Sequence, residues 1–96
     1  MELNLYVKEG DAFKVLQVPQ FVVKDLLRDR LSPSEVNRIH RLAEPVSVPD
    51  TFKPGSVVVD FSAKTAQCFQ SGLNLSILEP TWKVTAEAMT LGNYSV

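Results

Sequence analysis

Two side chains with catalytic or metal-binding potential occur once each in this chain, a histidine and a cysteine. His40 needs an orienting carboxylate and a substrate cleft to act as a general base, and the sequence shows neither. Asp60 and Glu87 are too scattered along the chain to be proposed as metal co-ligands. Cys68 falls on the apolar face of a predicted strand, which is typical of a small buried side chain rather than a reactive thiol. The sequence therefore indicates no catalytic residue, no metal site and no cofactor.

Basic residues on a predicted pair of helices suggest a different chemistry, the binding of phosphate groups. Arg38, His40 and Arg41 lie on the second of these helices, where a winged-helix protein would contact DNA. Residues 20–44, however, contain five basic and four acidic side chains, an excess of only one positive charge. Nucleic-acid binding normally needs a clearly positive stripe, whereas this spacing favours solvated ion pairs such as Glu35–Arg38. Nucleic-acid binding through these three residues is therefore the alternative interpretation.

The composition is that of one small soluble domain. The chain has 96 residues, of which 45% are hydrophobic and 22% charged, and its net charge is −1. This charge gives no overall attraction to nucleic acid or to an anionic membrane. A single cysteine excludes an internal disulfide framework. The first residues lack the pattern of a signal peptide and no apolar run is long enough to span a membrane, so we expect a single domain over residues 1–96 in the cytoplasm.

The first half of the chain predicts a hairpin followed by two helices. Leu3, Leu5 and Val7 alternate with polar residues, and a three-residue loop would place Val7 opposite Phe13 in the returning strand. A two-residue loop would place Val7 opposite Lys14, which is less favourable for an apolar side chain.

The two helices are predicted over Gln20–Leu31 and Pro33–Ala43. Ser32 and Glu35 form a capping box that starts the second helix. This helix is expected to bury four side chains: Val36, Ile39, Leu42 and Ala43. The segment Glu44–Gly55 contains three prolines and reads as an extended connector.

The stretch Gly55–Gln70 predicts the central hairpin of the sheet. Phe61 is expected opposite Ala66 and Val59 opposite Cys68. One face of this hairpin is then apolar throughout, and the opposite face carries Val58 and Phe69. Because two helices can cover only one face, the second must be closed by curling of the sheet, by the connector or by another chain.

A last hairpin is predicted near the C-terminal end. Leu73–Ile77 alternates as a strand, with a helical turn as the rival interpretation, and Trp82–Ala88 alternates in the same way. A tight turn would place Ile77 opposite Trp82. Leu91–Val96 fits either a short strand or a frayed tail.

These elements predict an α+β fold: a mostly antiparallel sheet of five to six strands in three hairpins, with two consecutive helices packed on one face. The favoured function is a non-enzymatic protein-binding or self-assembling module that uses a sheet face or edge, with itself or another protein as partner. Four apolar or aromatic residues are the candidate partner-binding set: Val58, Phe69, Trp82 and Tyr94. An enzyme with a site assembled from scattered residues, around His40 or Asp60, is a further alternative.

Overall fold

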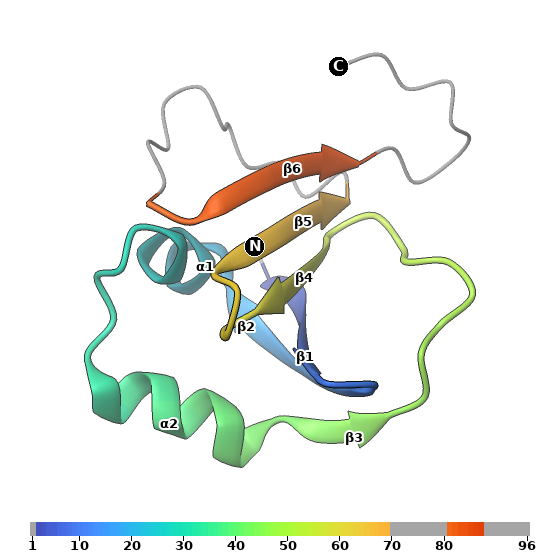
Figure 1. The fold of residues 1–96 in the computed structure, drawn as a ribbon, viewed down its shortest axis with the longest axis horizontal. Helices are drawn as coiled ribbons and strands as arrows, with labels where there is room; N and C mark the ends of the chain where they lie inside the picture. The colour runs from blue at the N-terminus through green and yellow to red at the C-terminus, as the bar shows by residue number, and fades with distance from the viewer. Residues whose placement is uncertain (1, 70–80, 88–96) are drawn as a thin grey trace.

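The computed structural model describes residues 2–69 and 81–87, which form six strands and two helices (Figure 1). The elements in chain order are β1 (Glu2–Glu9), β2 (Ala12–Pro19), α1 (Gln20–Leu27), α2 (Pro33–Leu42), β3 (Glu44–Val46), β4 (Ser56–Asp60), β5 (Thr65–Phe69) and β6 (Lys83–Glu87). All six strands belong to one sheet in the order β3-β2-β1-β4-β5-β6. The α+β class, with two consecutive helices beside one sheet, is confirmed.

The sheet is mixed rather than wholly antiparallel. β1 pairs with β2, β2 with β3 and β4 with β5 in the antiparallel sense. The pairings of β1 with β4 and of β5 with β6 are parallel. Parallel neighbours require a crossover connection, and the helices and the connector supply one between β2 and β4. The sequence predicted hairpins from local spacing, and local spacing carries no signal for these long-range parallel pairings.

The predicted register of the first hairpin is wrong. Val7 lies opposite Lys14, not Phe13, because the loop contains only Gly10 and Asp11. Gly10 has a φ of +62°, and a left-handed glycine at the first loop position suits the tight two-residue turns that match strand twist. Lys14 is tolerated on the helix-facing side because its Nζ lies 3.5 Å from the Glu9 carboxylate. Turn geometry therefore decides the register here, against apolar matching.

The central hairpin is shifted by two residues from its predicted register. Val59 lies opposite Ala66 and Val57 opposite Cys68. The Asp60 carboxylate accepts hydrogen bonds from the backbone N–H groups of Ser62 and Ala63, so a turn begins directly after Asp60. Because side chains alternate with a period of two, this shift leaves every side chain on its predicted face.

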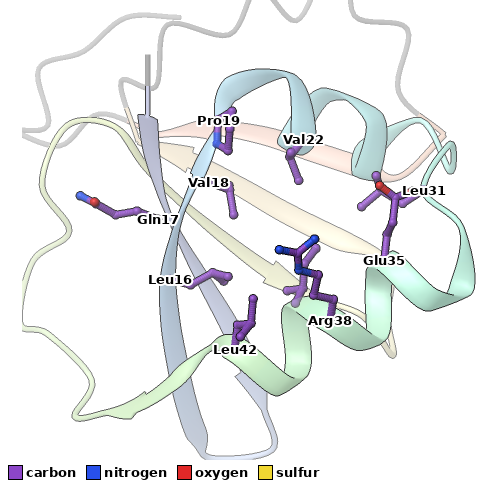
Figure 2. Close-up of a pocket in the computed structure, with 10 residues that line it drawn as sticks. Leu16, Gln17, Val18, Pro19, Val22, Leu31, Glu35, Arg38 and Leu42 are labelled. Carbon is purple, nitrogen blue, oxygen red and sulfur yellow. The ribbon is translucent and has the colours of Figure 1, made fainter.

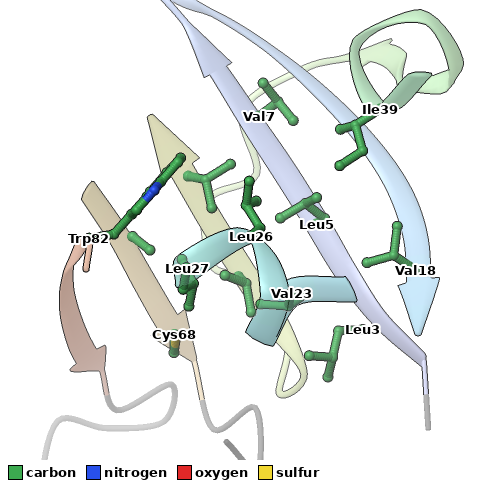
Figure 3. Packing of buried hydrophobic residues seen from close by; sticks show 13 residues of the cluster. Leu3, Leu5, Val7, Val18, Val23, Leu26, Leu27, Ile39, Cys68 and Trp82 are labelled. Atoms are coloured by element: carbon green, nitrogen blue, oxygen red, sulfur yellow. The ribbon is translucent and has the colours of Figure 1, made fainter. Parts of the chain in front are cut away.

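One apolar core lies between the helices and the sheet (Figure 3). Its buried side chains come from four strands, two helices and the segment before β6: Leu3, Leu5, Val7, Val18, Val23, Leu26, Leu27, Ile39, Val57, Val59, Ala66, Cys68 and Trp82. Cys68 is buried, as predicted. Three of the thirteen belong to α1, whereas Ile39 is the one contributed by α2. α2, although longer than α1, therefore contributes fewer buried side chains to the core.

The second face of the sheet is covered by the connector between β3 and β4. The Phe52 ring lies 5.0 Å from Tyr6 and 4.9 Å from Phe69, measured between ring centroids, and 6.5 Å from Phe13. Val58 on this face is only 7% exposed. The sequence left three alternatives for closing this face, and the structure shows that the Pro-rich connector covers it.

The first helix is shorter than predicted, ending at Leu27 rather than Leu31. The N–H of Arg30 donates to the Asp25 carbonyl at 2.8 Å and that of Asp29 to the Leu26 carbonyl at 3.0 Å, which is the hydrogen-bond pattern of a Schellman motif. Asp29 takes the left-handed position with a φ of +55°, where glycine is usual. The backbone N–H groups of Thr81 and Trp82 both donate to the Leu27 carbonyl.

The capping box that starts α2 is confirmed. The Glu35 N–H donates to the Ser32 hydroxyl, and the Ser32 N–H donates to the Glu35 carboxylate, each at 3.3 Å. β3 is a short strand inside the segment predicted as a connector. β6 lies within the predicted strand Trp82–Ala88. The predicted strand Leu73–Ile77, its pairing with Trp82, and Leu91–Val96 with Tyr94 lie outside the described residues.

Substituting Phe52→Ala should destabilise the protein, because it removes the ring that covers three others on the second face. We expect a loss of about 2 kcal/mol in the free energy of unfolding, below the value for a fully buried phenylalanine. Urea unfolding followed by tryptophan fluorescence measures it. Phe21→Ala is the matched control, since Phe21 is 64% exposed, and it should change stability by less than about 0.5 kcal/mol. Equal effects of the two changes would show that Phe52 does not close the face.

Candidate functional site

A groove lined mainly by apolar residues lies between the two helices, with β2 as its floor (Figure 2). Its volume is about 280 Å³. Seven of its lining residues are apolar and three are polar: Leu16, Val18, Pro19, Val22, Leu31, Ile39 and Leu42, then Gln17, Glu35 and Arg38. We call this feature the interhelical groove.

The groove exists because α2 is held to the core at few points. α2 was expected to bury Leu42, but this side chain is 51% exposed and lies at the wall of the groove. Leu16, Val22 and Leu31 pack against the core while remaining only partly buried. The apolar stripe of α2 is thus divided, with Ile39 facing the sheet and Leu42 left toward solvent.

Charge at the groove is set by two residues with different surroundings. The carboxylate of Glu35 is engaged in the capping box at the start of α2. Arg38 extends from α2 into the space between the helices (Figure 2) and forms no ion pair with any residue in the described ranges. The predicted Glu35–Arg38 ion pair is therefore absent from the described structure, because the cap takes the carboxylate.

The predicted partner-binding residues are not gathered on one exposed surface. Trp82 is 4% exposed and belongs to the core on the helix side of the sheet, whereas Val58 lies on the opposite face. Phe69 is half-buried against Phe52 on that same opposite face. Tyr94 lies outside the described residues. Among the exposed large hydrophobic side chains of the described residues, Leu42 is the one that lines the interhelical groove. Its spacing in the sequence predicted an interior position.

His40 has the orienting carboxylate that the sequence did not reveal. Its Nδ1 lies 3.2 Å from Glu9 Oε2, and its ring lies 4.6 Å from the Phe61 ring. Neither His40 nor Glu9 lines the interhelical groove. The pair joins α2 to the first hairpin. Among the three residues of the nucleic-acid alternative, Arg38 lines the groove, Arg41 is exposed and His40 turns toward the sheet.

A polar cluster around Asp29 ties three parts of the chain together. Its carboxylate accepts hydrogen bonds from the Thr81 hydroxyl at 2.6 Å, the Trp82 indole N–H at 3.0 Å and the Lys64 ammonium at 3.5 Å. The hydrogen bonds from Thr81 and Trp82, with a smaller effect of Lys64, lower the pKa of Asp29 below its ordinary value. Because the carboxylate is engaged by these internal donors, the cluster holds the end of α1 against the chain that enters β6.

Neither a metal centre nor a membrane span is found in the described part of the chain. No three histidine, cysteine, aspartate or glutamate residues within residues 2–69 and 81–87 lie close enough to hold a metal ion. The two described helices, of 8 and 10 residues, are too short to cross a membrane. The Ser56 hydroxyl is buried without a hydrogen-bond partner in the described structure, but it does not line the interhelical groove.

Comparison with protein-family models, with curated protein sequences and with solved structures gives no match to this chain. We therefore infer function from the interhelical groove and its charges.

The lowered pKa of Asp29 gives a stability effect with a defined sign. The folded state holds this carboxyl charged to a lower pH than the unfolded chain does, so its contribution is present above the ordinary value of 3.8 and is lost as the pH falls through the lowered pKa. We expect the unfolding free energy of the wild type to exceed that of Asp29→Asn near neutral pH, and the difference to shrink in acid. Urea unfolding over an acidic pH series measures this difference.

Thr81→Val tests the same cluster from the donor side, because it removes the hydroxyl that contributes most to the shift. This variant should show a weaker acid dependence than the wild type. A wild-type to Asp29→Asn difference that stays constant down to the lowest pH would contradict the assignment.

Proposed function

We propose that this protein is a non-enzymatic protein-binding module that accepts apolar side chains of a partner protein in the interhelical groove. The observation that carries the proposal is the apolar lining of the groove, with Leu42 left 51% exposed at its wall. Exposed apolar surface beside a hollow is characteristic of binding sites on soluble proteins. We place the module in the cytoplasm, because a chain with one cysteine forms no internal disulfide.

The size of the groove supports side chains rather than a cofactor as the occupant. Pockets that enclose small molecules usually measure about 300–1,000 Å³. At about 280 Å³ and open to solvent, the groove suits a few anchoring side chains of a larger partner.

The walls of the groove favour an amphipathic helix as the segment that docks. α1 and α2 supply two helical walls, and β2 supplies the floor. A third helix laid along this opening would place apolar residues one turn apart against Val22 and Leu42, as in other helix-in-groove complexes. It would also complete the packing of α2, which contributes one buried residue, Ile39, to the core.

Substituting Leu42→Asp should weaken partner binding without unfolding the protein, because it places a charge at the wall of the groove on a side chain that is already exposed. The probe is a displayed library of random peptides of about twelve residues, followed by fluorescence anisotropy of the peptides enriched on the wild type. Leu42→Asp should weaken their binding by roughly tenfold or more. Phe21→Asp is the matched control, since Phe21 is exposed and outside the groove, and it should bind as the wild type does.

Two outcomes would overturn this function. If the library yields no peptide that is enriched on the wild type relative to Leu42→Asp, the groove is not a binding site. Equal loss in Leu42→Asp and Phe21→Asp would show that the peptides recognise general apolar surface. Sedimentation of the wild type alone tests the alternative occupant, a second copy, which would appear as a dimer that Leu42→Asp dissociates.

Nucleic-acid binding is a second candidate, and one observation favours it. The four arginines of the helix pair, Arg28, Arg30, Arg38 and Arg41, form no ion pair with the described residues. Labelled duplex DNA titrated at low and moderate salt tests this candidate. Binding through phosphates should weaken steeply as the salt concentration rises, and Arg38→Ala with Arg41→Ala should reduce the salt slope. The absence of binding at low salt would eliminate it.

A further inference from the structure

We infer that the partner segment is acidic and that Arg38 is the residue that selects it. This inference rests on the proposed function, since it names the chemistry of the segment that enters the interhelical groove. Arg38 is a specificity-determining residue in this account: its guanidinium pairs with a carboxylate of the docked helix.

Arg38 is the one charged group of the groove without a local partner in the described structure. Both charged residues that line the groove belong to α2, one turn apart. The Glu35 carboxylate accepts hydrogen bonds from the Ser32 N–H at 3.3 Å and from the Ser32 hydroxyl at 3.2 Å. It also lies in the first turn of α2, where the helix dipole stabilises negative charge. The Glu35 carboxylate is therefore held by hydrogen bonds within the chain, whereas the Arg38 guanidinium forms no ion pair with the described residues.

Docking of a partner helix in the groove would remove water from the Arg38 guanidinium. The partner must therefore supply a group that can pair with this charge. The guanidinium reaches into the space between the helices (Figure 2), and the apolar side chains of Ile39 and Leu42 line the same groove. A helix that covers these side chains also covers part of the guanidinium. Burying a charge without a partner is strongly unfavourable, whereas a carboxylate can form a bidentate pair with arginine. An acidic segment is thus favoured, and a basic one is rejected by repulsion.

The order of residues along α2 locates the carboxylate on the partner. Leu42 follows Arg38 by four residues, so the two project from the same side of α2 on successive turns. A docked helix that places an apolar residue against Leu42 therefore presents its neighbouring turn to Arg38. The expected motif has two apolar residues one turn apart and an aspartate or glutamate on the adjoining turn.

The test uses three synthetic peptides built on the apolar positions of the tightest library peptide. They are identical except that the charged positions flanking the apolar pair are all glutamate, all glutamine or all lysine. We expect the wild type to bind the glutamate peptide roughly tenfold more tightly than the lysine peptide, with the glutamine peptide between them. Arg38→Glu should reverse this order.

Arg30→Glu is the matched control, because it makes the same change in charge at an exposed position that does not line the groove. It should keep the wild-type order of the three peptides. Equal binding of all three by the wild type, or a reversal in Arg30→Glu as complete as in Arg38→Glu, would overturn the selection by Arg38 while leaving the groove as a binding site. Loss of all three peptides in the wild type would count instead against the proposed function.

Discussion

A sheet with apolar side chains on both faces must be covered twice, and this requirement governs the rest of the structure. Val57 and Val59 point to one side of β4 and Val58 to the other. The helices cover the first side, and the connector brings Phe52 onto the second, against Tyr6 and Phe69. Because the chain supplies both covers itself, the sheet faces are largely closed within one copy. Leu42, at the wall of the interhelical groove, is an apolar side chain that stays open to solvent.

The two helices are held to the sheet in different ways, and this difference creates the groove. α1 contributes Val23, Leu26 and Leu27 to the core, and the Asp29 cluster fixes its end. α2 is anchored mainly by Ile39 and by the contacts of His40 with Glu9 and Phe61. An exposed polar contact of this kind contributes little to stability, typically below about 1 kcal/mol. The weakly anchored helix is thus the one that carries Leu42 and Arg38 at the groove.

Much of the fold could be predicted from the sequence, because it depends on local patterns. The alternation in β1 and β4, the apolar spacing of α1 and the Ser32–Glu35 capping box each identify an element from a few neighbouring residues. The register of the first hairpin could not be decided by apolar matching, since the two-residue turn at Gly10 prevails over it. The parallel pairing of β1 with β4 joins strands far apart in the chain, and nothing local signals it.

The candidate site was harder to predict, because it depends on where α1 stops. Sequence spacing continues the helix to Leu31, whereas Asp29 ends it in a left-handed conformation that aspartate adopts less readily than glycine. The shortened helix separates Leu31 from the α1 stripe and places it in the groove wall with Leu42. Both residues fit an interior position by spacing alone. The one signal present was the apolar spacing of α2 at Val36, Ile39, Leu42 and Ala43, and this spacing predicted that all four side chains are buried.

The central claim is that the chain closes both sheet faces itself and leaves Leu42 open to solvent at the groove. Proton NMR with a soluble paramagnetic agent tests this claim most directly, because signals weaken according to their contact with solvent. The account predicts strong attenuation for the methyl groups of Leu42 and the ring of Phe21, and protection for the side chains of Val58 and Trp82. Attenuation of Val58 and Trp82 as strong as that of Phe21 would contradict it.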